Sequence, residues 1–450
     1  MKTPVASGRA VRALGALVLL SAVSAPGARA IPSFARQTKL PCSACHTQFP
    51  ELTEFGRTFK LNAYTLTAIE QIGAQDSAGH QELALNLMPI VSIMAQVSWT
   101  QTMKAQGGSP NGNVLLPDQL SVFLAGAITP KVGAFVQLTY DPQSGSIVLD
   151  NTSLRYATQG SLLSQPTTFG LSVNNNPTVQ DLWNSTPVWG FPYAASSVAP
   201  TPAAATLIDG TLGGEVAGLS GYAYWNGTLY GEAGAYRSSP LGTTQPFDNA
   251  ASGIINGVAP YWRLAFTRSF GENYLEIGTY GIWARRQPGN FTSGGAGDRF
   301  TDLAVDFQYM RPFGGNSLTV TGTWIHESRN MAASVAAGDA SVTDQKLNTV
   351  RVRGTYHVGQ RYAFSLGPFL TSGTSDGTLY APGAISGSRL GGPNSSGAIA
   401  EIDYMPWENT RLALQYTAYA KFNGGTTNYD GSGRRASDNN TLYAVAWLMF

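Results

Sequence analysis

From residue 82 to the C-terminus, apolar and polar residues alternate with a period of two in runs of about ten residues. Over residues 83–99 one face is apolar throughout, while Asn86, Met88, Ser92 and Met94 lie on the other. Such two-faced strands are typical of a barrel wall between lipid and a polar or protein-filled lumen. The pattern therefore predicts an all-β fold, a transmembrane antiparallel barrel.

The number of strands follows from the runs and from the connections between them. Short turns near 129–130, 226–227, 271–272, 314–315, 359–360 and 408–409 each follow an even-numbered run, and long connections such as 175–212 follow odd-numbered ones. This arrangement is typical of outer-membrane barrels with both termini in the periplasm. The sixteen predicted strands are 82–99, 118–128, 131–140, 146–157, 167–174, 213–225, 228–237, 260–270, 273–285, 300–311, 317–327, 345–357, 361–371, 397–406, 410–421 and 440–450.

The chain ends indicate export to the bacterial outer membrane. Basic residues, an apolar run over 13–23 and the small-residue site Ala28-Arg29-Ala30 predict a signal peptide over residues 1–30. That run is too short to span a bilayer, which needs about 20 apolar residues. The last strand closes on Phe450, which resembles the assembly signal of outer-membrane proteins. The signal peptide, the alternation and the last strand together predict a lipid bilayer as partner. The net charge is +1 and no run of like charges occurs, so we expect no nucleic acid as partner.

Both cysteines lie in one motif, Pro41-Cys42-Ser43-Ala44-Cys45-His46. Two thiols in this spacing can form thioether links to haem, and the adjacent histidine then becomes the proximal iron ligand. We therefore predict one covalent haem c, held by Cys42, Cys45 and His46. The alternatives are a thioredoxin-like redox pair, a local disulfide or a chance match, and no βαβ pattern surrounds the motif to favour the first.

The predicted domains are the signal peptide 1–30, a monohaem cytochrome c segment 31–78 and a porin-like barrel 79–450. After the motif, residues 50–61 predict a short helix with Leu52, Phe55 and Phe59 on one face, packed on the haem. The cytochrome segment is too small to bury a core alone, so it needs the haem or a neighbouring surface.

The distal iron ligand is not decided by any motif. Met88 is the preferred candidate because it lies on the inward face of the first strand, followed by His80 and Met94; an open site is a further alternative. An axial methionine would raise the haem potential relative to a second histidine.

Alternation also directs a group of charged side chains into the lumen. One interpretation is that the acids among them guide a metal cation toward the haem; pairing with the neighbouring arginines is the favoured interpretation. No residue pattern indicates a hydrolytic or phosphate-binding site, so no catalytic residue is assigned. The group comprises Arg263, Glu276, Asp302, Asp306, Arg351, Arg353, Glu401 and Asp403.

The segment 32–64 resembles the N-terminal region of the fused outer-membrane cytochrome-porins. The matching features are Phe34-Ala35-Arg36-Gln37-Thr38, the Cys42, Cys45 and His46 motif, Pro50, Leu52, Phe55-Gly56-Arg57 and Phe59-Lys60. Family members generally have glycine where this chain has Lys39. The resemblance implies a haem-carrying plug in a sixteen-stranded pore, and its best-known members oxidise ferrous iron at the cell surface.

The expected function is single-electron transfer between an extracellular donor, with Fe(II) as a candidate, and a periplasmic carrier such as a soluble cytochrome. An Fe(II):cytochrome c oxidoreductase activity stays open at this stage. Two alternatives also stay open: a diffusion porin whose haem plug gates it, and electron export to an extracellular acceptor.

Overall fold

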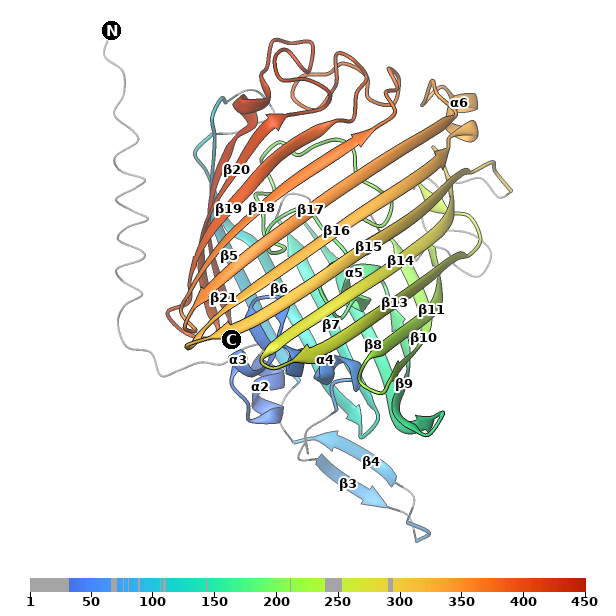
Figure 1. The fold of residues 1–450 in the computed structure, drawn as a ribbon, viewed down its shortest axis with the longest axis vertical. Coiled ribbons are helices and arrows are strands. Elements are labelled where there is room, and N and C mark those ends of the chain that lie inside the picture. The colour runs from blue at the N-terminus through green and yellow to red at the C-terminus, as the bar shows by residue number, and fades with distance from the viewer. Residues whose placement is uncertain are drawn as a thin grey trace.

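In the computed structural model, the described part of the chain forms a closed antiparallel barrel of sixteen long strands (Figure 1). The described residues are 32–65, 71–75, 77–79, 81–87, 90–105, 107, 111–142, 145–210, 212–238, 253–289 and 294–450. The predicted signal peptide lies outside them. The barrel strands are β5 (Val91–Thr102), β6 (Asn113–Thr129), β7 (Val132–Asp141), β8 (Ser146–Leu162), β9 (Gln165–Asn174), β10 (Val216–Trp225), β11 (Leu229–Ser238), β13 (Ala259–Phe270), β14 (Asn273–Gln287), β15 (Asp298–Phe313), β16 (Asn316–Asn330), β17 (Asp344–Val358), β18 (Tyr362–Gly373), β19 (Ser395–Tyr404), β20 (Thr410–Lys421) and β21 (Thr441–Met449).

The wall closes where β21 pairs with β5, and β12 (Ile254–Ile255) is a two-residue strand that extends the edge of β14. Short turns join β6 to β7, β8 to β9, β10 to β11, β13 to β14, β15 to β16, β17 to β18 and β19 to β20, while the long connections lie at the other end (Figure 1). The predicted strand number and the predicted alternation of short and long connections are confirmed. Two short helices, α6 (Ala332–Ala337) and η1 (Ala436–Asn439), lie in long connections.

The two faces of the wall differ as the alternation predicts. Leu264, Ile277 and Ile402 are at least half exposed on the outside, while Arg263 and Glu276 are fully buried on the inside. A closed barrel has no unpaired strand edge, and the outer surface of this one is apolar. Strands that cross a bilayer need both properties. No helix in the described residues is both long and apolar enough to cross a membrane.

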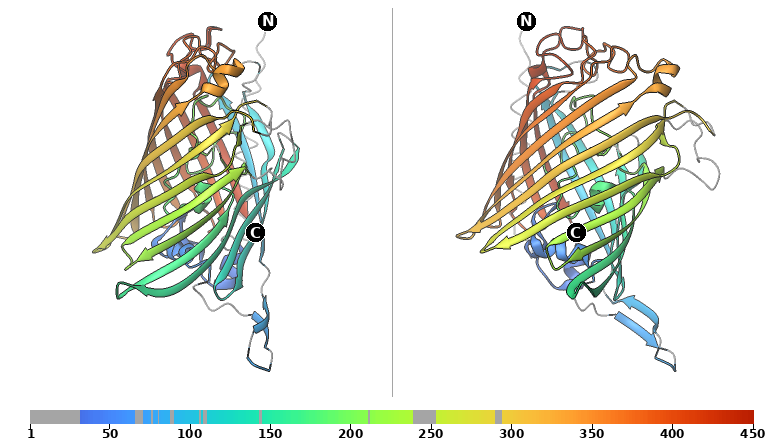
Figure 2. Two further views of the ribbon diagram at one scale, coloured as in Figure 1. Left: turned by 90° about the vertical axis from the view of Figure 1, so that its right-hand side faces the viewer. Right: turned by 45° about the vertical axis from the view of Figure 1, so that its right-hand side comes forward.

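The first predicted strand, 82–99, is wrong as a single element. It divides into β4 (Gln81–Asn86) and β5, because β4 pairs with β3 (Gln71–Gln75) in a hairpin that projects from the short-turn end of the barrel (Figures 1 and 2). The ladder with β3 satisfies the backbone of β4 outside the wall. The predicted domain boundary between residues 78 and 79 falls within this hairpin. Within Val91–Thr102 the inward and outward positions alternate as predicted.

Residues 32–65 form a compact unit, here called the plug, at the short-turn mouth of the barrel (Figure 2). It contains α2 (Pro32–Thr38), α3 (Cys42–Cys45), the pair β1 (His46–Gln48) and β2 (Glu51–Leu52), and α4 (Glu54–Leu61). The predicted helix over 50–61 therefore begins four residues late, because Glu51 and Leu52 pair with β1 and Thr53 caps the helix by accepting a bond from the Gly56 N–H.

The connection between β9 and β10, residues 175–215, is here called the internal loop. The sequence places it among the outside loops, but it enters the lumen with its short helix α5 (Pro177–Gln180) (Figure 1). Its side chains explain why: Leu182, Trp183, Leu207 and Ile208 are almost fully buried. Burying such apolar area inside the barrel is more favourable than exposing it to water.

Candidate functional site

The two cysteines begin and end the single-turn helix α3, and His46 follows in extended backbone. Helix α4 packs directly against this turn at Gly56, where an added Cβ would overlap the Cys45 carbonyl oxygen. Thr53 holds the same turn, donating its hydroxyl hydrogen to the Ala44 carbonyl at 2.6 Å. The residues after the motif therefore fix the geometry of the motif itself.

His46 is held in one orientation by the plug. Its Nδ1 lies 3.2 Å from the Glu51 carbonyl oxygen, which can only accept, so Nδ1 carries the hydrogen. Burial lowers the pKa of His46 to about 4, so the ring is neutral near pH 7. A neutral imidazole with its Nδ1–H bonded to a backbone carbonyl presents Nε2 as an electron-pair donor, the arrangement common to metal-ligating histidines.

The cysteines do not resemble a reactive redox pair. Burial raises the pKa of the Cys45 thiol to about 11. Thioredoxin-like motifs depend on the opposite shift, because the thiolate is the reactive form. This environment disfavours the thioredoxin-like alternative.

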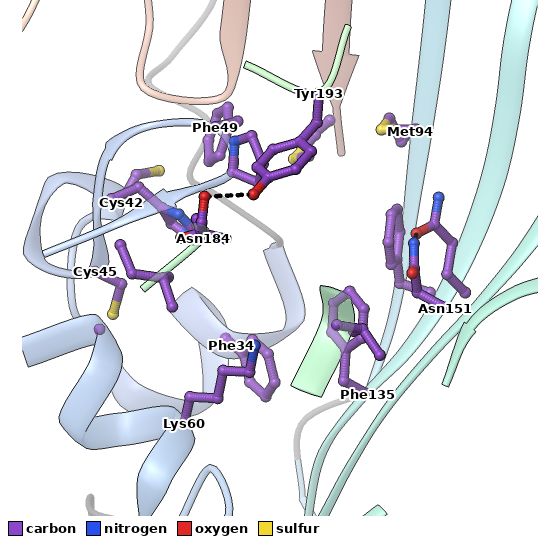
Figure 3. Close-up of a pocket in the computed structure, with 18 of the residues that line it drawn as sticks. Phe34, Cys42, Cys45, Phe49, Lys60, Met94, Phe135, Asn151, Asn184 and Tyr193 are labelled. Atoms are coloured by element: carbon purple, nitrogen blue, oxygen red, sulfur yellow. Dashed lines mark hydrogen bonds between the residues drawn. The ribbon is translucent and has the colours of Figure 1, made fainter. Parts of the chain in front are cut away.

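A cavity of about 510 Å³ adjoins the motif, and Cys42, Cys45 and His46 all line it (Figure 3). Its volume lies within the roughly 300–1,000 Å³ of small-molecule and cofactor sites. The donor set is that of covalent haem c, and most of the lining surface is apolar, so the residues present fit the group. Plug and barrel wall both contribute apolar side chains: Phe34, Phe49, Leu52, Phe59, Phe123, Phe135 and Trp447.

The predicted apolar face of the helix is confirmed in part. Leu52 and Phe59 line the cavity, but Phe55 is 38% exposed and does not. Because α4 starts at Glu54, its buried side carries Gly56, Arg57, Phe59 and Leu61 instead. Lys39 adopts a left-handed backbone with φ of 59° after the end of α2, a conformation that glycine adopts most readily.

Hydrogen bonds and one ion pair tie the plug to strands around the whole barrel. The Cys42 N–H donates to Glu408 at 2.7 Å, which anchors the motif itself to the turn before β20. Gly126 and Gly133 leave room where Gln37 and Ala63 approach the wall. The other ties are Ser33 to Ser92, Gln37 to the Ala125 carbonyl, Arg57 to Gln308, Tyr222 to the Leu61 carbonyl, Arg411 to the Phe49 carbonyl and Arg353 to Glu51.

The internal loop is bonded to the wall just as widely. Its bonds reach β5, β14, β15, β16 and β20, which lie on different sides of the lumen. The loop therefore crosses the interior between opposite walls, above the plug at the short-turn mouth. The contacts are Ser196 with Thr100, Trp183 with Tyr274, Ile208 with Asp302, Leu207 with Glu327, and the Phe191 carbonyl with Gln415.

The lumenal charges predicted from alternation all lie inside, and most pair with arginine. Arg263 contacts Asp306 and Glu276 on the wall and lies 3.6 Å from Asp181 of the internal loop. The remaining pairs are Arg411 with Glu401 and Asp403, both at 2.6 Å, Arg351 with Asp209 at 2.7 Å, and Arg353 with Glu51. Asp302 accepts the Ile208 N–H at 2.8 Å. Because these acids already take part in ion pairs and hydrogen bonds, their arrangement supports pairing with the arginines rather than a path for cations.

The structure separates the candidate distal ligands. Met88 and His80 lie outside the described residues. Met94 lines the cavity, and so does Met449, which the sequence did not single out. His357 is buried beside a second cavity, of about 250 Å³, which Cys42 and His46 also line. Gly56 was likewise missed as a site residue, although glycine inside a helical pattern signals close backbone approach.

No protein-family model matches the chain, and no curated protein matches it. Among solved structures, a loop L8 deletion mutant of OmpT from Vibrio cholerae aligns over 80% of this chain and 98% of its own, with 11% identity and a TM-score of 0.45. The DcaP channel of Acinetobacter baumannii (80% and 96%, 11% identity, TM-score 0.45) and Salmonella typhi OmpF (80% and 97%, 13% identity, TM-score 0.45) align similarly. These likenesses are too distant to bear on function, which rests on the residues of the site.

Proposed function

We propose that this chain is an outer-membrane c-type cytochrome in which a porin-like barrel holds a haem-binding plug. The observation that carries the proposal is His46, fixed by the Glu51 carbonyl at the wall of a cavity that both cysteines share. Cys42 and Cys45 would hold the group covalently and His46 would be the proximal ligand. The chemistry that a bound haem c supplies is reversible one-electron transfer, here between an extracellular donor, with Fe(II) as the candidate, and a periplasmic carrier.

The protein's own contribution is to hold, bury and orient this site. Phe49, Phe59 and Trp447 line the cavity with buried apolar surface, and the Cys42 bond to Glu408 fixes the motif against the wall. The short turns and the plug lie at one end of the barrel. In outer-membrane barrels that end faces the periplasm, so a periplasmic carrier would approach from the plug side and the extracellular donor from the long connections.

The contents of the lumen support this proposal over a diffusion porin. A diffusion pore needs a continuous water-filled path, whereas the internal loop bonds to opposite walls and the plug lies across the short-turn mouth. Electron export to an extracellular acceptor would use the same site. The direction of transfer depends on the haem potential relative to those of the two partners.

The proposal is tested by producing the chain in a host with c-type cytochrome maturation and examining the detergent-purified protein. We expect a haem-sized increase in the mass of the denatured chain and a c-type pyridine haemochrome spectrum. His46→Ala should lose the reversible redox signal while the barrel still folds. His326→Ala is the matched control, because His326 lies on the outer side of β16 between the buried Ile325 and Glu327. A chain that matures without covalent haem would refute the proposal.

The donor is tested separately by mixing the oxidised protein anaerobically with Fe(II) and following the haem absorbance in stopped flow. Fast reduction supports Fe(II) as donor. Reduction by dithionite but not by Fe(II) would keep the cytochrome and exclude this donor.

A further inference from the structure

Two methionine side chains of the barrel wall lie beside the cavity next to the motif. Met94 on β5 is 2% exposed and Met449 on β21 is 4% exposed, and they are direct cross-strand partners where the barrel closes. Both belong to one apolar cluster with Cys42, Phe49 and Trp447. Thioethers are common gap-fillers in cores, so their position relative to the motif has to decide whether they do more.

The positions of the two cysteines identify which side of the motif the distal ligand must come from. Both thiols have to reach the same group, and both line the larger cavity, whereas Cys45 does not line the smaller cavity that contains His357. The larger cavity is therefore the side on which a group bound to Cys42, Cys45 and His46 would lie. His357 is on the other side of the motif.

Met94 faces the motif across this cavity. Figure 3 shows its sulfur directed into the cavity from β5, opposite Cys42 and Cys45 on the plug. The sulfur's one polar contact given by the structure is weak, with the Gln96 amide nitrogen at 4.0 Å. The thioether lone pairs are therefore available to a metal.

Met94 is better placed than Met449 to be held as a ligand. It lies inside a strand that is paired on both sides, with β6 and β21. Met449 is the last residue of β21, and its backbone bonds to Asn409 at the short-turn rim. Side chains on the interior of rigid elements are positioned more accurately than those at their ends.

We infer that Met94 is the distal axial ligand of the haem iron, which makes the barrel wall and the plug each contribute one ligand. This inference rests on the proposed function. Its consequence is that the redox centre is completed only when the plug is seated in the closed barrel. Methionine ligation also raises the haem potential relative to a second histidine.

The test is spectroscopy of the purified oxidised protein. Wild type should show the weak near-infrared charge-transfer band of methionine-ligated ferric haem, and Met94→Leu, which conserves volume, should lose it and bind added imidazole. Met94→His should stay low-spin with a lower midpoint potential. Met449→Leu is the matched control and should keep the band.

Several results would overturn the inference. They are a bis-histidine signature in wild type, a band lost in Met449→Leu but kept in Met94→Leu, or conversion of the spectrum by His357→Ala. The wild-type spectrum decides the ligand class even if a variant fails to fold. Failure of the proposed function is recognised independently, because covalent haem is then absent from the denatured chain's mass.

Discussion

The barrel wall and its contents are held in place by different interactions. Each long strand of the wall bonds to a neighbour on both sides through backbone ladders. The plug and the internal loop are attached to the wall mostly through side chains, such as Gln37, Arg57 and Arg263. The wall therefore has the means to fold without a particular filling, whereas the plug depends on the wall. Whether the barrel conducts therefore depends on the second set of contacts.

The largest expected effect comes from removing the internal loop. Replacing residues 182–208 by a short Gly/Ser linker removes the contacts with Thr100, Tyr274, Asp302, Glu327 and Gln415 and should leave the wall intact. We expect a large rise in single-channel conductance in planar bilayers, because the lumen loses its filling. A linker replacing 378–390 in the connection between β18 and β19 is the control and should not conduct more. Porin-like conductance in wild type would contradict the view that the internal loop and the plug block the lumen.

A smaller effect should follow from Arg263→Leu. This change leaves Asp181, Glu276 and Asp306 buried without their shared cation. Removing one partner of a buried ion pair costs about 3–5 kcal/mol. We expect the internal loop to become sensitive to limited proteolysis in detergent while the strands stay resistant.

The exposed Arg268 on the same strand gives the matched control, since Arg268→Leu should not change the cleavage pattern. If cleavage of the strands and of the loop appeared together, the loop and the wall would be one cooperative unit.

The smallest effect concerns Lys60, which lines the cavity and donates to the Asp181 carbonyl at 2.7 Å. Burial lowers the pKa of Lys60 to about 7, and Arg155 adds to this lowering. Below that pH the ammonium is charged and would favour the reduced, less positive form of the proposed haem, so its midpoint potential should fall as pH rises through about 7.

Lys60→Met should flatten this part of the potential-versus-pH curve in spectroelectrochemical titration and lower the potential at pH 6. Lys131→Met, at an exposed position on the short-turn rim, should not change the curve. Identical slopes of potential against pH in wild type and Lys60→Met would show that the charge of Lys60 does not change the midpoint potential.

Much of the wall was predictable because strand periodicity is a local property. Alternation correctly assigns the inward Arg263 and the outward Leu264, and turn residues such as Asn226 and Gly227 give the register of short and long connections. The assignment of Cys42, Cys45 and His46 to haem stays a prediction, made from a spacing that is itself the chemical requirement, and the structure adds that all three line one cavity. The pairing of β21 with β5 is not a local property of the sequence, since it joins the last strand of the wall to the first.

The sequence by itself determined the two-faced strands, their number and the candidate haem ligands on the plug, because each depends on neighbours within a few residues. Only the tertiary structure decided that 81–86 leave the wall, that α4 turns Phe55 outward, and that residues 175–215 enter the lumen. The tertiary structure also places Met94 beside Met449 and at the cavity that the motif lines. Those outcomes depend on which distant backbone or apolar surface a segment can reach, and barrel closure supplies that surface.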